Sequence, residues 1–303
     1  MMRLRWSPAG LVGLIVVAGC GGSAGDAVVD RTPVSEQTDQ VAVEMAGLRA
    51  SVDESVARCM REAGYPSFPK SKEQHLAGLR ELYSIGLAIV DPALAESEGY
   101  GVSEEPAAEE VRYFDSLTDA ESDAYQSIQL GDPVSDVVEF TTPSGLTGSL
   151  PVGGCTGDAA SEVYGSVENY RDGSAIFYEL QDMMSEVTAA VEADDRFVDA
   201  LAAWGECMAD AGQQFSTPNE AREQALTSRT DSDEGLVSDS ERAIAVADAG
   251  CQEKGSLSEV YFEVALDHQS RLESKRSRVF LGWGELMDRV EEQRTAADGS
   301  QEG

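Results

Sequence analysis

Cys20 is the residue whose chemistry is easiest to specify from its surroundings. It follows small residues at the end of a short apolar run that begins at Leu11, and Arg3 and Arg5 precede that run. This layout is a secretory signal, and its apolar core is too short to cross a bilayer. With cysteine at the cleavage site, the pattern is typical of a bacterial lipobox. We therefore expect residues 1–19 to be removed and the Cys20 sulfur to carry a lipid such as palmitate.

Four more cysteines lie beyond the signal. An even number of cysteines in an exported chain favours disulfides over a metal site or a catalytic thiol. No two of them have the close Cys-x-x-Cys spacing that zinc sites use. Free buried thiols are the alternative, since export does not guarantee pairing. The expected disulfide cysteines are Cys59, Cys155, Cys207 and Cys251.

The chain has two histidines, His75 and His268. His268 falls on the apolar stripe of a predicted helix, which indicates a core histidine with a hydrogen-bond partner rather than a general base. His75 stands beside Lys72 and Glu73 and is predicted to lie at the surface. Neither histidine belongs to a metal-binding spacing. Beyond the expected tether at 20–32, no Gly-x-Ser-x-Gly nucleophile motif is present.

Paired carboxylates are the remaining catalytic option. A glycosidase needs two carboxyl groups about 5 to 10 Å apart. Candidates precede the aromatic residues Tyr113 and Phe114, which could stack on sugars. The alternative is a solvated acidic loop. The candidates are Glu104, Glu105, Glu109 and Glu110.

A calcium loop fits one segment only in part. Thr230–Glu241 has glycine and the final glutamate at the positions of an EF-hand, but Thr230 replaces the first aspartate ligand. Ser238 and Glu241 also have the spacing of a helix capping box, which explains the glutamate without calcium. The sequence therefore predicts no metal and no cofactor.

The net negative charge of the chain indicates which classes of partner it can bind. The chain has 56 acidic and 22 basic residues, for a formal net charge of −34. Such a chain repels nucleic acid and acidic lipid headgroups. We expect no nucleic-acid partner, and a protein partner would be a cationic component of the envelope. The alternative is that the acidity only keeps the protein soluble.

Apolar stripes at helical spacing run through most of the chain. They predict a mainly α fold, because side chains three and four positions apart share one helix face. One β-hairpin is expected near 137–151, where Pro143-Ser144-Gly145 separates two short alternating segments. Helices are expected at about 34–63, from 72, 118–130, 176–191, 197–211, from 218, 238–251 and 258–292.

The order of two cysteine motifs is repeated along the chain and suggests two halves. The sequence CMREAG at 59–64 recurs as CMADAG at 207–212, and Cys155 and Cys251 each precede a Ser-Glu-Val-Tyr segment. Convergence on a common helix end is the alternative to duplication, because the intervening lengths differ. The repeated order predicts one disulfide in each of two pseudo-repeat halves.

The predicted pairs are therefore Cys59–Cys155 and Cys207–Cys251. The predicted organisation is a signal at 1–19, a lipidated cysteine and flexible tether at 20–32, a first helical half at 33–170, a second at 171–292 and a disordered tail at 293–303.

Several short motifs carry a family resemblance. They are the two Cys-Met-x-x-x-Gly segments, Gly153-Gly154-Cys155, Trp204 before the second Cys-Met, and Ala247-Asp248-x-x-Cys251. In these the chain resembles a family of secreted proteins and lipoproteins of high-GC Gram-positive bacteria. That family has no assigned activity, so the resemblance implies an envelope location and paired cysteines but no catalytic residue.

The sequence thus favours a lipid-anchored protein on the extracytoplasmic face of the cell membrane. The expected function is non-enzymatic binding or assembly. The alternative is a carboxylate-dependent hydrolase of cell-wall glycan. A cleft holding two carboxyl groups with shifted pKa values would favour the enzyme, and an exposed apolar patch rimmed by polar groups would favour the binding protein.

Overall fold

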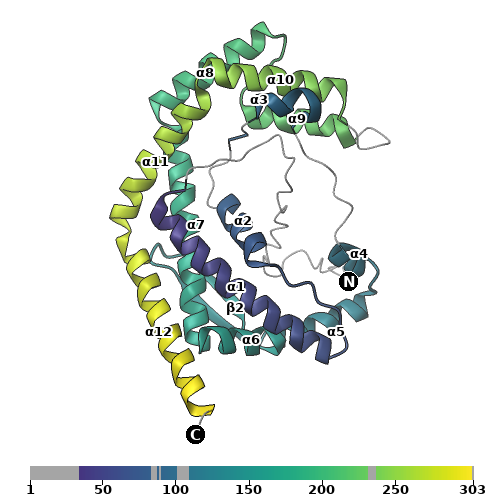
Figure 1. The fold of residues 1–303 in the computed structure, drawn as a ribbon, viewed down its shortest axis with the longest axis vertical. Helices are drawn as coiled ribbons and strands as arrows, with labels where there is room; N and C mark the ends of the chain where they lie inside the picture. Colours follow the sequence, from purple (N-terminus) through teal and green to yellow (C-terminus); the bar gives the residue numbers. More distant parts are fainter. Residues whose placement is uncertain (1–33, 83–86, 89, 101–108, 231–236, 302–303) are drawn as a thin grey trace, which may run out of the picture.

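The structure is a computed structural model that describes residues 34–82, 87–88, 90–100, 109–230 and 237–301 (Figure 1). This part of the chain forms twelve helices and one two-stranded sheet. In chain order the elements are α1 (Glu36–Glu62), α2 (Lys72–Leu82), α3 (Pro92–Glu98), α4 (Glu109–Asp115), α5 (Asp119–Leu130), β1 (Val137–Thr141), β2 (Thr147–Pro151), α6 (Gly154–Tyr164), α7 (Val167–Glu192), α8 (Asp195–Asp210), α9 (Pro218–Thr230), α10 (Asp239–Lys254), α11 (Leu257–Lys275) and α12 (Ser277–Gln301). The predicted mainly α fold with one small hairpin is confirmed.

The helices form an arc in which α11 links two groups (Figure 1). The group at one end contains α1, α2, α5, α6, α7, the hairpin and α12. The group at the other end contains α3, α8, α9 and α10. Helix α11 packs on α8 and α10 as well as on α7, and one hydrophobic cluster runs through both groups. The two groups therefore share a core.

The halves of the sequence interleave in space. The boundary expected at residue 170 lies inside α7, which is one continuous helix. Helix α3, from the first half, packs on α10 of the second. Helix α12, from the second half, packs on α7 and α1. A pseudo-repeat in the sequence thus does not correspond to two separate bodies.

The apolar stripes supply the core as predicted. On α7, Leu180, Met183, Val187 and Val191 all lie on one face and are almost fully buried. Each such side chain stabilises the fold by roughly 1.5 to 3 kcal/mol relative to an exposed one. A second, smaller cluster, which we call the satellite cluster, contains Val56, Met60, Tyr125, Cys155 and Ala159.

The hairpin is anchored to α7. Strands β1 and β2 pair antiparallel with Phe140 opposite Gly148. A Cβ at Gly148 would lie 2.5 Å from the Phe140 ring, so glycine makes room for that ring. Phe140 stacks on Tyr178 of α7 with 5.0 Å between ring centroids. At the turn, the Ser144 backbone N–H donates to Glu179 Oε2 (2.9 Å).

The periodicity predicts one long C-terminal helix over 258–292. This prediction is wrong, because the helix is broken at Arg276. Arg276 has φ −107° and ψ 28°, and it separates α11 from α12. Its largely buried guanidinium lies among three carboxylates of α7, namely Glu179 (3.0 Å), Asp182 (2.9 Å) and Glu186. A charged side chain with so little access to water needs such partners, and these partners lie about ninety residues earlier in the sequence.

The structure also differs from the predicted disordered tail at 293–303. Helix α12 continues to Gln301, so most of that segment is helical. The first residues of the segment 293–303 are hydrogen-bonded to the rest of the fold: Asn169 Nδ2 donates to Gln293 Oε1 (3.1 Å), and Arg294 donates to the Val163 carbonyl (3.3 Å). These contacts extend the ordered helix beyond its apolar stripe.

Candidate functional site

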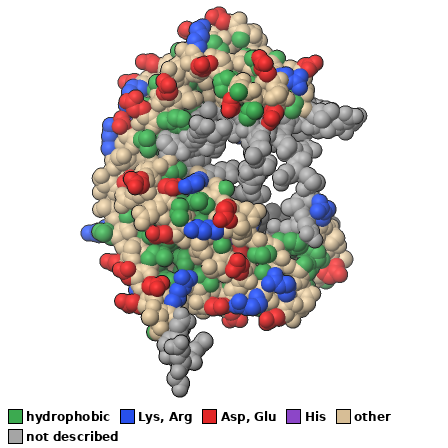
Figure 2. Space-filling model, viewed as in Figure 1, with side chains coloured by type: hydrophobic (Ala, Val, Ile, Leu, Met, Phe, Trp, Pro, Cys, Tyr) green, Lys and Arg blue, Asp and Glu red, His purple; other side chains and the backbone are tan. Residues whose placement is uncertain are grey.

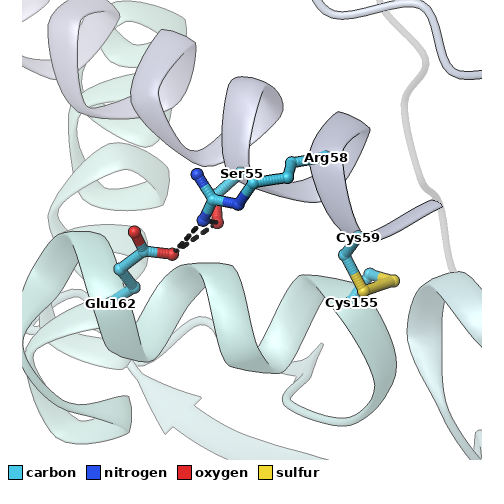
Figure 3. Close-up of a disulfide and its surroundings, with 5 residues drawn as sticks. All are labelled: Ser55, Arg58, Cys59, Cys155 and Glu162. Atoms are coloured by element: carbon cyan, nitrogen blue, oxygen red, sulfur yellow. Dashed lines mark hydrogen bonds and ion pairs between the residues drawn. A yellow bond between two sulfur atoms is a disulfide. The ribbon is translucent and has the colours of Figure 1, made fainter. Parts of the chain in front are cut away.

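The first disulfide joins the end of α1 to the start of α6 (Figure 3). Cys59 and Cys155 are bonded with 5.6 Å between their Cα atoms, as the sequence predicts. The same two helices share a polar tie, in which Ser55 Oγ and Arg58 Nη2 both donate to Glu162 Oε2 (2.6 and 2.7 Å). The side chains of Arg58 and Glu162 are 57% and 58% exposed, so water screens this ion pair.

The second disulfide joins α8 to α10. Cys207 and Cys251 are bonded, again with 5.6 Å between Cα atoms and in the predicted pairing. One turn earlier on each helix, Trp204 Nε1 donates to Asp248 Oδ1 (2.9 Å). Trp204 and Asp248 are both fully buried. This corner therefore combines a covalent bond with a polar contact that excludes water.

Asp248 is the centre of what we call the Asp248 node. Besides Trp204, its carboxylate accepts from Tyr100 Oη (2.8 Å) and Gln252 Nε2 (2.9 Å). Gln252 Nε2 also donates to the Ala88 carbonyl (2.8 Å). The carboxylate thereby joins α8, α10 and the segment at Tyr100, and Gln252 extends the node to the segment at Ala88.

Burial raises the pKa of Asp248 to about 6, and the hydrogen bonds from Gln252, Tyr100 and Trp204 offset only part of that rise. Burial and the neighbouring Asp248 carboxylate raise the pKa of Tyr100. A carboxyl group with a raised pKa is the signature expected of a general acid. Here all three partners are protein donors and the group is sealed from solvent, so its geometry is that of a structural contact.

A cleft of about 460 Å³ lies along α9. Arg222, which lines it, also acts electrostatically on Tyr100 of the node. Its Nε is buried and has no hydrogen-bond partner within the described part of the chain. The other described lining residues are Asn219, Glu223, Leu226 and Thr227. The cleft offers one guanidinium and one carboxylate.

Both histidines are paired with aspartates. His268 Nε2 lies 3.0 Å from Asp194 Oδ2, so the predicted hydrogen-bond partner is confirmed, whereas the side chain is 19% exposed and lies outside the buried core. Hydrogen bonds from Arg196 and His268 hold the pKa of Asp194 well below its usual range. His75 Nε2 lies 2.9 Å from Asp53, and only 13% of its side chain is exposed. The predicted surface position of His75 is therefore wrong, because Asp53, 22 positions earlier, covers and binds its ring.

Aromatic side chains gather at the satellite cluster, in what we call the aromatic corner. Phe114 lies edge-on to Tyr125 with 5.0 Å between ring centroids, and Tyr113 lies 6.0 Å from Tyr125. Phe68, from the segment after α1, lies 5.9 Å from Tyr113. The aromatic corner consists of Tyr65, Phe68, Tyr113, Phe114 and Tyr125.

The predicted carboxylate pairs are not tested by this geometry. Glu104 and Glu105 lie outside the described residues, and so do the side chains of Glu109 and Glu110. Of the trial calcium loop, residues 231–236 also lie outside. Glu241 at its end is buried, and its Oε1 accepts the Tyr100 backbone N–H (3.2 Å). Among the described residues, no group of three or more histidine, cysteine or carboxylate side chains could hold a metal.

In the sequence, Trp204 and Asp248 stand out only as parts of short motifs. Their contact could have been suspected, because each stands three positions before a cysteine of the predicted second pair. Two helices joined at those cysteines bring the preceding turns together. Tyr100 gave no such signal, since it lies 148 positions from Asp248.

Comparisons with known proteins give no relative: no family model matches the chain, and no curated protein or solved structure matches it at a significant level. Cys20, the predicted lipidation site, lies outside the described residues. None of the helices in the described ranges is long and apolar enough to span a bilayer.

Proposed function

We propose that this chain is a lipid-anchored protein of the extracytoplasmic face of the cell membrane, where it binds a partner without catalysing a reaction. The observation that carries the proposal is the pair of disulfides. Both join helices far apart in sequence, at separations of 96 and 44 residues. Structural disulfides of this kind persist in oxidising compartments outside the cytoplasm.

The N-terminal sequence supports the same location. Arg3, Arg5, the apolar run from Leu11 and the cysteine at position 20 form the lipobox pattern. The Gly- and Ala-rich segment after Cys20 would act as a tether that keeps the folded domain near the membrane and lets it reorient toward a partner. The net charge of −34 favours a cationic partner.

A glycan hydrolase is the second candidate. The aromatic corner favours it, because the exposed Phe114 ring, which follows the acidic segment 104–110 in the sequence, could stack on sugars. Against it stands Asp248, a carboxyl group whose pKa is raised. Three protein donors occupy its oxygens, and no substrate could reach it.

Two experiments test the proposal. Replacing Cys20 by serine should abolish partition into detergent phases, and unchanged partition would contradict the anchor.

Purified chain incubated with peptidoglycan should release no glycan fragments. Release that is lost when Glu104, Glu105, Glu109 or Glu110 becomes glutamine, with the fold retained, would establish the hydrolase instead.

A further inference from the structure

The aromatic corner is the part of the described surface where an aromatic side chain is most open to solvent. Phe114 is 36% exposed and is the one aromatic among the large exposed hydrophobic residues of the described chain. Phe68, Tyr65 and Tyr113 beside it are half-buried. Figure 2 shows hydrophobic side chains reaching the surface over α4 and α5. Aromatic side chains that are partly exposed to solvent and also well packed are typical anchors of protein interfaces.

The rings are held rather than loose. Phe114 makes edge contacts with Tyr125 (5.0 Å) and Tyr113 (5.4 Å), and a longer contact with Phe68 (6.5 Å). Tyr125 is buried in the satellite cluster beside the first disulfide. These side chains would therefore lose little conformational entropy when a partner contacts Phe114.

The helices that carry Tyr113, Phe114 and Tyr125 also carry exposed carboxylates. Asp115, Asp119 and Asp123 on α4 and α5 are exposed, and they form no ion pair with any described residue. Arg112 is the one basic residue within these two helices. Elsewhere the chain places several carboxylates around one arginine, as at Arg276. The carboxylates of Asp115, Asp119 and Asp123 are thus available to pair with an external cation.

We propose that the aromatic corner and its three aspartates form the docking surface for a basic, apolar-rich segment of a partner protein. The inference rests on the binding function proposed above and names its site. Arginine and lysine gain from both features, since their cations are attracted to carboxylates and to ring faces while their stems pack on apolar surface. The same carboxylates repel acidic partners.

The test measures binding of a fluorescent peptide of alternating arginine and leucine to the full chain in zwitterionic detergent. A peptide with glutamate in place of arginine is the ligand control. Phe114→Ala should weaken binding at least tenfold. The double change Asp119→Asn and Asp123→Asn should weaken it several-fold and flatten its salt dependence, because fewer charges remain to be screened.

Matched control variants lie on α12, away from this corner (Figure 1). Leu281→Ala removes another exposed apolar side chain, and Glu285→Gln with Asp288→Asn removes two exposed carboxylates. Both should bind the peptide within about twofold of the wild type. Circular dichroism would check that Phe114→Ala keeps its helices, and the aspartate variant tests the site without altering the core.

Three results would overturn the inference. One is equal binding of the acidic peptide, and another is equal loss of binding in the α12 controls. The third is binding of soluble glycan fragments by the wild type with no binding of the basic peptide. The proposed membrane location is judged separately by the Cys20→Ser partition experiment, so the two failures are distinguishable.

Discussion

The two disulfide corners begin from the same local structure and differ in what surrounds them. At Gly64 and Gly212 the helices end with positive φ (89° and 80°). Tyr65 N–H donates to the Met60 carbonyl (2.9 Å), and Gln213 N–H donates to the Met208 carbonyl in the same way (2.9 Å). Both ends are Schellman motifs.

The second cysteine of each pair has a different setting. Cys155 begins α6, whereas Cys251 lies in the last turn of α10. The first corner packs on the small satellite cluster and has an exposed polar tie. The second lies in the main core and contains the Asp248 node. One sequence motif thus supports two corners, of which one depends mainly on its covalent bond.

Removal of the disulfides should give the largest effects. Cys59→Ala with Cys155→Ala opens a loop of 96 residues, and Cys207→Ala with Cys251→Ala opens one of 44. The chain-entropy relation gives losses of about 4.7 and about 4 kcal/mol in the free energy of unfolding. Urea denaturation would measure both. An equal or larger loss for the shorter loop would contradict this ranking.

The same variants separate local from global opening. Loss of the first disulfide should expose the segment around α4 and α5 to limited proteolysis before the rest, because the satellite cluster is small. Loss of the second should destabilise the whole chain together. Early cleavage near α4 in both variants would show that the corners do not differ in this way.

Truncation of the polar ties should give the next largest difference. Asp248→Ala leaves the donors of Trp204, Tyr100 and Gln252 buried without their acceptor, and should cost about 3 to 4 kcal/mol. Glu162→Ala removes an exposed tie and should cost less than about 1 kcal/mol. Thermal and urea unfolding of the two variants side by side would check this. Similar losses would remove the distinction between the corners.

The raised pKa of Asp248 should make the free energy of unfolding depend on pH. Its folded-state pKa of about 6 lies above the ordinary 3.8, so the folded state binds the proton more tightly than the unfolded state. Stability from this group is therefore greatest below about pH 4 and falls as pH rises through 6, by about 3 kcal/mol in total. Asp248→Asn should lack this component. Parallel stability curves for wild type and variant between pH 4 and 7 would refute it.

Substitution of the two helix-ending glycines should cost less stability than Asp248→Ala, and should cost about the same at both corners. Alanine at Gly64 or Gly212 must adopt a positive φ, which costs roughly 1 to 2 kcal/mol. No atom lies within 4 Å of a Cβ at either position, so backbone strain alone is tested. Losses that differ by more than about 1 kcal/mol would show that the ends are not equivalent.

Local signals account for what the sequence could predict. Thr118 and Glu121 form a reciprocal capping box at the start of the helix expected over 118–130, and Ser238 caps α10 through the Glu241 N–H. The hairpin forms around Pro143-Ser144-Gly145 and spans residues 137–151, where it is expected. Each of these features depends on residues a few positions apart, whose preferences are visible in the sequence.

Features that depend on distant partners could not be predicted. The helix break at Arg276 is set by α7 carboxylates that no periodicity reveals. The burial of His75 depends on Asp53, and the Asp248 node depends on Tyr100. In each case a polar side chain that looks ordinary in the sequence acquires its role from tertiary packing.

The most direct test of the account is an intact-mass measurement of the protein extracted from its native membrane without reductant. The account predicts a chain that begins at Cys20, carries acyl groups, and gains four hydrogens on reduction because two disulfides open. A mass that includes residues 1–19, lacks acyl groups, or does not change on reduction would contradict the proposal of an oxidised, lipid-anchored extracytoplasmic protein.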